Sequence, residues 1–387
     1  MTMNPTLIRA VCAVALAGIM LCAGPMTRAW AASVNAGLNE PNPVQPFAMA
    51  AVAEFENPWA IAFLPDGRLL VTEKAGRLFI VTQDGAKTEV AGVPDVYVRG
   101  QNGMLDVAAS PDFEQDHVIY FTFVAPGPGG GALELARARL EESAGAARLA
   151  DLAIIWHQEA GSSGGQPGGI IAFAPDGRHL FLSVGDRQRP STAQDPDQAR
   201  GKVLRLNLDG SVPPDNPMAG AGGVRAETWT TGHRNPYGLA FDAAGRLWLH
   251  EMGPRGGDEL NLIVRGRNYG WPEVSNGNNY SGIPIPDHAT RPEFEPPVVY
   301  WTPVIAPAGL AFYEGDLFPA WRGSALIGGL VSRGLVRVVF DDQGGANEAE
   351  RWDLGHRIRD VAVAADGAVW LVEDGRAGRL LRLSPRG

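Results

Sequence analysis

The chain has almost no cysteine, no excess of basic residues and no apolar run long enough to cross a bilayer. Both cysteines, Cys12 and Cys22, lie in an N-terminal segment that we expect to be removed, so the mature chain has no disulfide or thiol chemistry. The formal net charge of -10 argues against a nucleic-acid partner, because binding phosphates needs a basic face. We therefore expect neither nucleic-acid binding nor a membrane span.

Residues 1–31 have the features of a cleavable export signal. Arg9 precedes an apolar stretch that ends at Cys22 and is too short to span a bilayer, and Ala29-Trp30-Ala31 fits a signal-peptidase site. We predict a signal peptide over 1–31, a linker over 32–50, and a secreted or periplasmic protein.

What the chain has in abundance is glycine (49) and proline (30), which favour the tight turns of an all-β fold. A turn followed by an alternating apolar strand recurs six times, and glycine supplies the positive φ that such hairpin turns need. Six copies predict a six-bladed β-propeller over 51–387, with a sandwich or a two-domain all-β arrangement as the alternative. The copies begin at Pro65, Pro111, Pro175, Ala243, Gly315 and Ala365.

Two regions, 185–235 and 251–300, are rich in Gly, Pro, Asn and Asp, which favour turns over strands. We expect them to be long loops on the top face, where function usually resides. The Ala-, Arg- and Glu-rich segment 133–152 is compatible with a short helix, but strands and a turn are the better interpretation.

Two polar constellations suggest ligand binding. The segment 250–272 mixes carboxylates with backbone carbonyls near Gly253, which is the oxygen chemistry that calcium prefers, unless it is only an acidic turn. Arg357 and Arg359 alternate along a predicted strand and so point the same way. Together with Arg234 they suit a polyanionic ligand, or else form surface ion pairs with Asp360 and other acids.

Six motifs in order resemble those of the soluble glucose/sorbosone dehydrogenase family, from about residue 50 to the C-terminus. They are ENPWAIAFLPDGRLLVTEKAGRLFIV, GQNGMLDVAASPDF, GKVLRLNLDGSVPPDNP, GHRNPYGLAFD, EMGPRGGDELNLIVRGRNYGWP and RIRDVAVAADG. The resemblance implies a six-bladed propeller that binds pyrroloquinoline quinone (PQQ) and calcium and oxidises aldoses at the anomeric carbon, with hydride transfer to the quinone.

The resemblance also implies residue roles. Gly253 and Pro254 would offer backbone oxygens to a calcium ion, and Glu259 and Tyr269 match positions associated with a second, structural calcium. The quinone would be contacted by Gln101, Arg234, Asn235, Arg357 and Arg359.

The pattern breaks at the base. The family's histidine is replaced by Gln166, which cannot accept a proton, and a general base typically contributes about 10²- to 10⁴-fold. Asp186 is the nearest usable carboxylate in sequence if it is partly desolvated. The segment 330–338 also lacks a lysine that some relatives place against the quinone, and Arg333 is the candidate to compensate.

Three functions follow from this sequence. The first is a PQQ-dependent aldose dehydrogenase with an altered base, which would need an external electron acceptor. The second is a propeller that binds a sugar or quinone without this catalysis, and the third is an interaction propeller without a small-molecule role. The retained arginines and Gly253-Pro254 favour the first two. The sugar, the acceptor and the choice between monomer and homodimer stay open.

Overall fold

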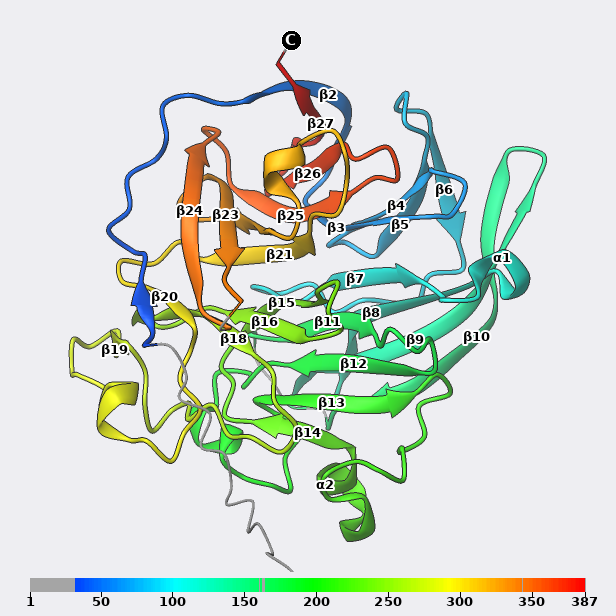
Figure 1. Cartoon of the computed structure of the whole chain (residues 1–387). Coiled ribbons are helices and arrows are strands. Elements are labelled where there is room, and N and C mark those ends of the chain that lie inside the picture. The colour runs from blue at the N-terminus through cyan, green and yellow to red at the C-terminus, as the bar shows by residue number, and fades with distance from the viewer. Residues whose placement is uncertain (1–31, 160, 162–163, 343, 387) are drawn as a thin grey trace, which may run out of the picture. The chain divides into compact units, whose positions relative to one another are not determined.

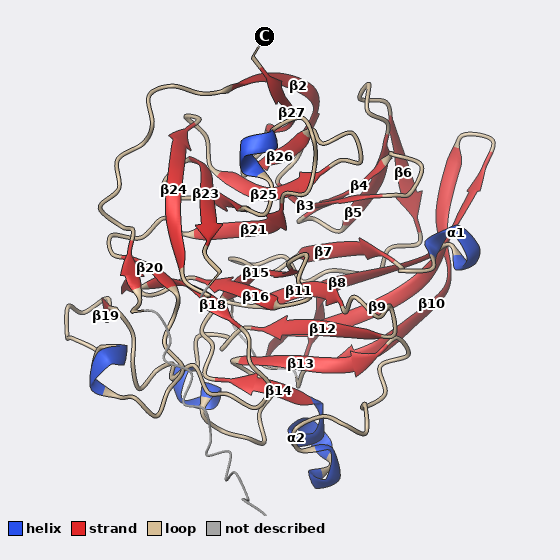
Figure 2. Cartoon of the chain, in the orientation of Figure 1, coloured by secondary structure: helices blue, strands red, loops and turns tan. Residues whose placement is uncertain are grey.

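The computed structural model describes residues 32–159, 161, 164–342 and 344–386. The predicted signal peptide, 1–31, lies outside these residues. Within them strands predominate and helices are few and short (Figure 2). None of the helices in the described part of the chain combines the length and apolarity needed to cross a membrane.

The strands form six blade-like sheets along the described chain (Figure 1). The first blade contains β3 (Pro58–Phe63), β4 (Leu69–Glu73), β5 (Arg77–Val81) and β6 (Lys87–Ala91). The second contains β7 (Met104–Ala109), β8 (Val118–Gly127), β9 (Gly130–Ser143) and β10 (Ala146–His157). The third contains β11 (Gly168–Phe173), β12 (His179–Val184), β13 (Lys202–Asn207) and β14 (Thr228–Thr231). A parallel β6–β10 pair joins the first two sheets.

The remaining three blades follow in chain order. The fourth blade contains β15 (Pro236–Phe241), β16 (Leu247–Glu251), β18 (Asp258–Leu262) and β20 (Val299–Trp301), and β1 (Val34–Asn35) pairs at its edge. The fifth contains β21 (Pro307–Phe312), β22 (Ala325–Gly329), β23 (Gly334–Phe340) and β24 (Ala346–Asp353). The sixth contains β25 (Ile358–Val363), β26 (Val369–Glu373), β27 (Gly378–Pro385) and β2 (Phe47–Phe55). The smaller elements are β17 (Arg255–Gly256) paired with β19 (Gly277–Asn278), helices α1 (Phe113–Asp116) and α2 (Gly223–Glu227), and 3-10 turns at Pro190–Ala193, Ala219–Ala221, His288–Thr290 and Pro319–Trp321.

The six sheets close into a ring. The first strands of the sheets, β3, β7, β11, β15, β21 and β25, contact one another in this order, and β25 contacts β3 again. The N-terminal strand β2 pairs with β27 and completes the last sheet. The described residues therefore form the predicted six-bladed β-propeller. The segment 32–50, which was expected to be a linker, contains β1 and the start of β2.

The predicted hairpin turns are present. Gly67, Gly177 and Gly367 have φ of +85°, +66° and +84°, a region that is open to glycine without strain. In each turn the preceding aspartate accepts the N–H of the residue two positions on. Local chemistry therefore fixes the hairpin between the first two strands of these blades.

The two regions expected to be long loops are only partly loops. The segment 185–235 contains β13 and β14, and 251–300 contains β18 and β20, all of which are blade strands. Apolar residues of β13, such as Leu204 and Leu206, are fully buried and override the surrounding turn-rich composition. The segment 133–152 lies in the β9–β10 hairpin, so the strand interpretation is confirmed over the short helix.

Polar side chains on the second strands of four blades link each of these blades to the next. Thr72 on β4 accepts the N–H of Ala60 at 3.0 Å and donates to the carbonyl of Leu105 on β7 at 2.7 Å. Buried links of this kind fix the blade spacing, because an unpaired polar group would be costly there. Equivalent links join Thr122 to Gly169, Ser183 to Pro236 and His250 to Gly309.

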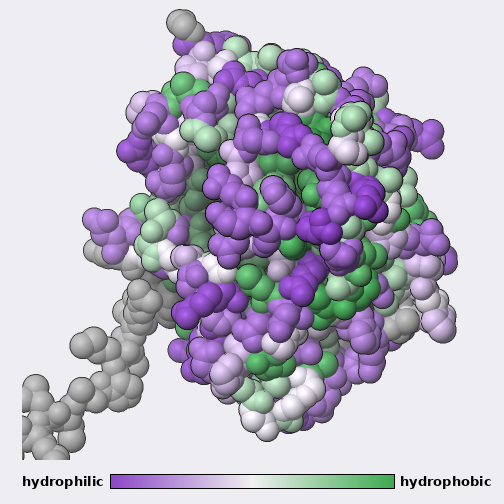
Figure 3. Space-filling model, turned by 90° about the vertical axis from the view of Figure 1, so that its right-hand side faces the viewer, coloured by the Kyte–Doolittle hydropathy of each residue, from purple (hydrophilic) through white to green (hydrophobic). Residues whose placement is uncertain are grey.

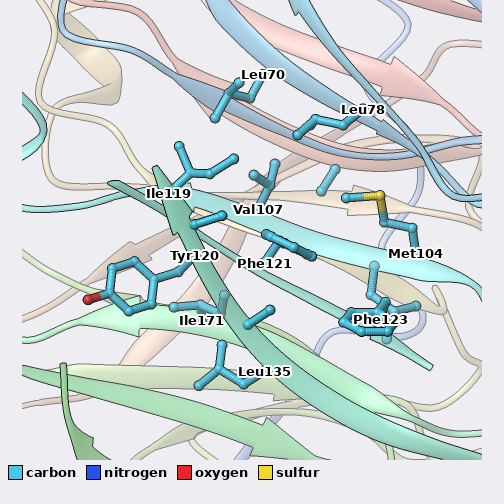
Figure 4. Packing of buried hydrophobic residues seen from close by; sticks show 14 of the residues in the cluster. Leu70, Leu78, Met104, Val107, Ile119, Tyr120, Phe121, Phe123, Leu135 and Ile171 are labelled. Atoms are coloured by element: carbon cyan, nitrogen blue, oxygen red, sulfur yellow. The ribbon is translucent and has the colours of Figure 1, made fainter. Parts of the chain in front are cut away.

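Apolar side chains fill the space between neighbouring blades. Figure 4 shows Leu70 and Leu78 of the first blade facing Met104 and Val107 of β7. Packing of this kind supplies most of the stabilisation of such a fold. From the side, the surface is largely hydrophilic, and hydrophobic residues are visible mainly in its hollows (Figure 3).

The ring encloses a cavity of about 170 Å³ lined by residues of all six first strands. Asp106 and Asp360 face this cavity, and each accepts a backbone N–H from the next blade, at 2.7 and 2.8 Å. Both aspartates are half-buried: each borders the cavity and is otherwise surrounded by protein. Burial raises the pKa of Asp106 to about 7, and burial together with the charge of Asp106 raises the pKa of Asp360 to about 8.

These carboxyl groups make stability depend on pH. In the unfolded chain they ionise near pH 4, so between about pH 4 and 8 the folded state binds more protons. The free energy of unfolding is therefore expected to fall as pH rises through this window. Asp360→Asn should flatten this decline in Tm measured from pH 5 to 8, and Asp95→Asn, at an exposed position, should not. An unchanged slope in Asp360→Asn would contradict this assignment.

Candidate functional site

The candidate site lies at one edge of the blades. Several blades contribute residues before or at the start of the first strand and just after the end of the second, and antiparallel pairing brings these two points together. Asn57 and Lys74 flank β3 and β4 of the first blade in this way. The same edge carries Gln101, Gln166, Asn235, Met252, Arg357 and Asp374.

The main pocket at this edge has a volume of about 350 Å³, and we call it the arginine pocket. It brings together the predicted residues Gln101, Arg357 and Arg359. Three cationic side chains and one carboxylate line it, although the whole chain is acidic. The pocket therefore suits an anion. Its remaining lining residues are Asn57, Trp59, Lys74, Gly100, Tyr237, Met252, Ala306, Leu330, Asp374 and Gly375.

Asp374 holds the two arginines in place. Arg357 Nε donates to one carboxylate oxygen at 2.6 Å, and Arg359 Nη2 donates to the other at 2.8 Å. Burial would raise the pKa of Asp374, but Arg359 and Arg357 outweigh it, so the pKa lies below its ordinary value. The guanidinium of Arg359 also lies 4.2 Å from the ring centre of Trp59. Both guanidinium groups are thus fixed beside the pocket.

Lys74 is a third cation of the pocket that the sequence interpretation did not include. Its ammonium donates to the carbonyl of Gly100. Burial, and then the charge of Arg359, lower its pKa below the ordinary value for lysine. Arg333, which was expected to compensate for a missing lysine, is exposed and donates to the carbonyl of Gly355. It is not among the residues that line the arginine pocket.

Arg234 and Asn235 lie beside the pocket at the start of β15. The carboxylate of Glu251 accepts the N–H of Arg234 at 2.5 Å and contacts His233 Nδ1 at 2.9 Å. These two contacts fix the backbone of residues 233–234. Arg234 Nη1 donates to the carbonyls of Met252 and Gly253 at 2.8 and 2.9 Å. Arg234 Nε and Asn235 Oδ1 are buried and have no partner among the described residues. A bound ligand would supply the missing partners.

Gln166 lies behind the arginine pocket rather than in its wall. Its N–H donates to Gln101 Oε1 at 2.5 Å, and its own Oε1 accepts the N–H of Gln188 at 3.2 Å. Its φ of +52° places it in the left-handed region. The side chain is 8% exposed, so the amide is held by neighbouring backbone.

Asp186 shares a partner with Gln166. Its Oδ1 also accepts the N–H of Gln188, at 2.8 Å, and its Oδ2 accepts Trp271 Nε1 at 2.8 Å. Burial raises the pKa of Asp186 to about 6, although Trp271, Arg234 and Gln188 all favour the charged form. The residue is fully buried, so its carboxylate does not face the arginine pocket directly.

Gly253 and Pro254, the predicted ligands of the first calcium ion, lie in the loop that follows β16. Asp258 holds this loop: Oδ1 accepts the N–H of Gly253 at 2.9 Å, and Oδ2 accepts those of Ile305 and Ala306 at 2.8 and 2.7 Å. Pro254 follows Gly253 and is buried. The described residues contain no cluster of three or more His, Cys, Asp or Glu side chains suited to a metal. Any calcium here would need backbone oxygens.

The second predicted metal position is occupied by protein contacts. Glu259 lies 3.3 Å from His288 Nε2 and accepts Asn261 Nδ2 at 3.2 Å. The hydroxyl of Tyr269 donates to the carbonyl of Leu262 at 2.6 Å and is 1% exposed as a residue. Glu259 and Tyr269 do line a common cavity of about 10 Å³, the size of one water molecule.

Comparisons with known proteins agree with these motifs. The family model for glucose/sorbosone dehydrogenases matches residues 55–382. An aldose sugar dehydrogenase from Escherichia coli (strain K12) is 38% identical over 343 residues, which cover 86% of this chain and 91% of that protein.

Solved structures also resemble the chain. A crystal structure of a glucose dehydrogenase matches with a TM-score of 0.83 at 42% identity, covering 88% of this chain and 100% of the other. The PQQ-bound form of an aldose sugar dehydrogenase from Streptomyces coelicolor matches with a TM-score of 0.73 at 29% identity, covering 90% and 100%.

Proposed function

The chain belongs to the glucose/sorbosone dehydrogenase family, and on this basis we propose that it is a PQQ-dependent oxidoreductase that oxidises aldoses to lactones at the anomeric carbon. The observation that carries the proposal is the arginine pocket with its three cations. PQQ is a tricarboxylate, so this pocket matches it in charge. The unpartnered Arg234 Nε and Asn235 Oδ1 beside the pocket support a polar ligand there.

In this proposal the chain's own residues bind and orient the quinone. Arg357, Arg359 and Lys74 pair with its carboxylates, and Gln101 and Asn235 complete its polar contacts. Arg234 stabilises negative charge that develops during the reaction. When bound, PQQ supplies the two-electron sink for the oxidation.

Calcium fits the proposed site only in part. Gly253 and Pro254 can offer two backbone oxygens, whereas calcium takes six to eight oxygen ligands, so quinone oxygens and water would have to supply the rest. Arg234 also donates to the Gly253 carbonyl, which leaves that oxygen a single free lone pair. Glu259 and Tyr269 remain a proposed second calcium site, with the Glu259 contacts to His288 and Asn261 competing for the metal.

Proton transfer is the weak step of the proposed reaction. The amide of Gln166 cannot take the proton of the sugar hydroxyl. Asp186 has a pKa of about 6, which suits a base, but both of its oxygens are bonded and it is enclosed. In this arrangement the proton must leave through water or through movement around Trp271. We therefore expect slow turnover that increases with pH.

Replacing Arg359 tests the cofactor assignment. Arg359→Leu should weaken PQQ binding by about 10- to 100-fold, because a hydrogen bond to a charged group contributes about 1.5–3 kcal/mol. Asp374 keeps Arg357 as a partner in this variant, so the pocket should stay folded. The measurement is a titration of the quinone absorbance, and Arg382→Leu, on β27 and paired with Asp366, serves as the control. Equal affinities in both variants would place the quinone elsewhere.

The second candidate function is a propeller that binds a sugar or quinone without this catalysis, and the absence of a base at Gln166 favours it. Reconstitution with PQQ and calcium, followed by dye reduction with a panel of aldoses, separates the two. If PQQ and calcium raise Tm and no aldose reduces the dye, the binding function is supported. If they change neither Tm nor the quinone spectrum, both proposals fail.

Export of the chain belongs to the same proposal. The predicted signal in 1–31 would place the protein outside the cytoplasm, where an external acceptor would reoxidise the quinone. N-terminal sequencing of protein recovered from the periplasm or medium tests this directly. A mature protein that still begins at Met1 would contradict it.

A further inference from the structure

A second cavity, of about 390 Å³, lies between the end of the second blade and the third blade. Its wall comes from the end of β10, from residues 197–200 before β13, and from α2. It shares no lining residue with the arginine pocket. We call it the rim cavity, and the residues that bear on its chemistry are Trp156, Gln158, Glu159, Asp197, Arg200 and Glu227.

Gln158 is the unusual residue of the rim cavity. Its side chain is only 3% exposed, yet neither its amide oxygen nor its amide nitrogen has a partner among the described residues. Its backbone is fixed, because its N–H donates to the carbonyl of Leu133 at 2.8 Å. Leaving a buried donor and acceptor unpaired costs about 1–3 kcal/mol each. A ligand group in the cavity that hydrogen-bonds this amide would offset that cost.

The neighbours of Gln158 are polar and already arranged. Trp156 Nε1 donates to Glu227 Oε2 at 2.9 Å, and burial raises the pKa of Glu227. Arg200 Nη1 donates to Gln198 Oε1 at 2.5 Å, while its buried Nε has no partner in the described part of the chain. Gln158 and Arg200 thus each have buried polar atoms without a partner among the described residues, at the wall of the cavity and near an indole ring.

The chemistry of these groups identifies the kind of ligand. An amide that needs both a donor and an acceptor is matched by a hydroxyl group, which is both. Three carboxylates, one arginine and His157 line the cavity, and Arg225 on α2 pairs with one of the carboxylates, Asp197. The lining therefore has no excess of arginine or lysine side chains that would favour an anion such as phosphate. The indole of Trp156 gives an apolar wall for carbon-bound hydrogens. We propose that the rim cavity binds a neutral polyhydroxylated ligand, a monosaccharide or a similar polyol, separately from the proposed cofactor site.

The test uses the full mature chain without PQQ, so that the proposed redox site is not loaded. Binding of glucose, galactose, xylose and glycerol is measured by calorimetry and by the shift in Tm. At least one should bind saturably to the wild type, and Gln158→Met, which keeps the length but removes the amide, should weaken binding at least tenfold. Gln115→Leu, at an exposed glutamine in α1, should bind as the wild type does.

The outcomes separate this inference from the proposed function. Loss of sugar binding in Gln158→Met supports the rim cavity if this variant and the wild type give the same result in a PQQ titration. This conclusion does not depend on whether the wild type binds PQQ. Equal sugar affinity in Gln158→Met and wild type overturns the proposal, because the sugar would then sit elsewhere. A crystal soaked in the sugar that shows only ordered water at Gln158 also overturns it. If Gln158→Met does not fold, Trp156→Phe with a fluorescence titration provides the same comparison.

Discussion

Gln166→His is expected to raise the turnover of the PQQ-loaded protein by about 10²- to 10⁴-fold, the usual contribution of a general base. The replacement restores a side chain that can accept a proton at neutral pH. The measurement is kcat with an aldose and a dye, made at saturating PQQ and calcium so that cofactor binding does not limit the rate.

The surroundings of Gln166 suit this replacement. Histidine tolerates the left-handed backbone better than most residues, and φ here is +52°. Gln166 and Asp186 already share the N–H of Gln188 as a partner, so a histidine at 166 would have a buried carboxylate nearby to orient its ring. Under the proposed function, Gln166→His would therefore place a base beside groups that can orient it.

The pH profile distinguishes a restored base from a general improvement of the site. Turnover of the wild type should continue to rise with pH, whereas Gln166→His should level off above the histidine pKa, near 6.5 for an unperturbed ring. Gln166→Leu serves as the control, because it also removes the amide but adds no base. If Gln166→His binds PQQ normally and gains no activity, slow proton transfer does not explain the low turnover. The position of the bound quinone would then be the explanation to test.

Asp258→Ala is expected to cause the largest loss of stability, about 3–5 kcal/mol in the free energy of unfolding. The carboxylate accepts three backbone N–H groups, from Gly253, Ile305 and Ala306, and each buried donor left unpaired costs about 1–3 kcal/mol. Urea unfolding followed by tryptophan fluorescence measures the change.

A matched control and a milder variant make this result interpretable. Asp112→Ala, at an exposed position, should change the free energy of unfolding by less than about 0.5 kcal/mol. Asp258→Asn keeps one acceptor oxygen and should lose less than Asp258→Ala. Equal stability of Asp258→Ala and wild type would show that the loop around Gly253 is not held by this carboxylate.

The propeller could be predicted from sequence because its turns are local. An aspartate followed by a glycine, such as Asp66 and Gly67, fixes the hairpin: the aspartate side chain accepts a backbone N–H, and the glycine adopts a positive φ. Both residue types can be recognised in the sequence. Ring closure could not be predicted this way. The pairing of β2 with β27 joins segments far apart in sequence, and β2 carries no turn signal of its own. The expected boundary at 51 therefore falls inside β2.

The site residues were predicted unevenly for a similar reason. Gln101, Arg357 and Arg359 converge on one pocket as expected. Lys74 and Asp374 were missed although the repeat carries the signal: each directly follows the glutamate that ends a second strand, as Met252 does. Matching positions in successive repeats would have placed them at the same edge. The side-chain direction of Arg333 could not be foreseen, because it depends on a φ of +54° and on Gly355 in the loop between β24 and β25.

The position of β2 also bears on how the chain folds. Arg386 Nε donates to the carbonyl of Phe47 at 3.0 Å across 339 positions of sequence, beside the β2–β27 pairing. During synthesis β2 emerges long before its partner β27, the last strand to be made, so its apolar Phe47 and Phe55 stay uncovered while the other blades form. Closing so long a loop is entropically unfavourable and slow. We expect ring closure to be the final step of folding and the exposed β2 to be the segment that a chaperone would protect.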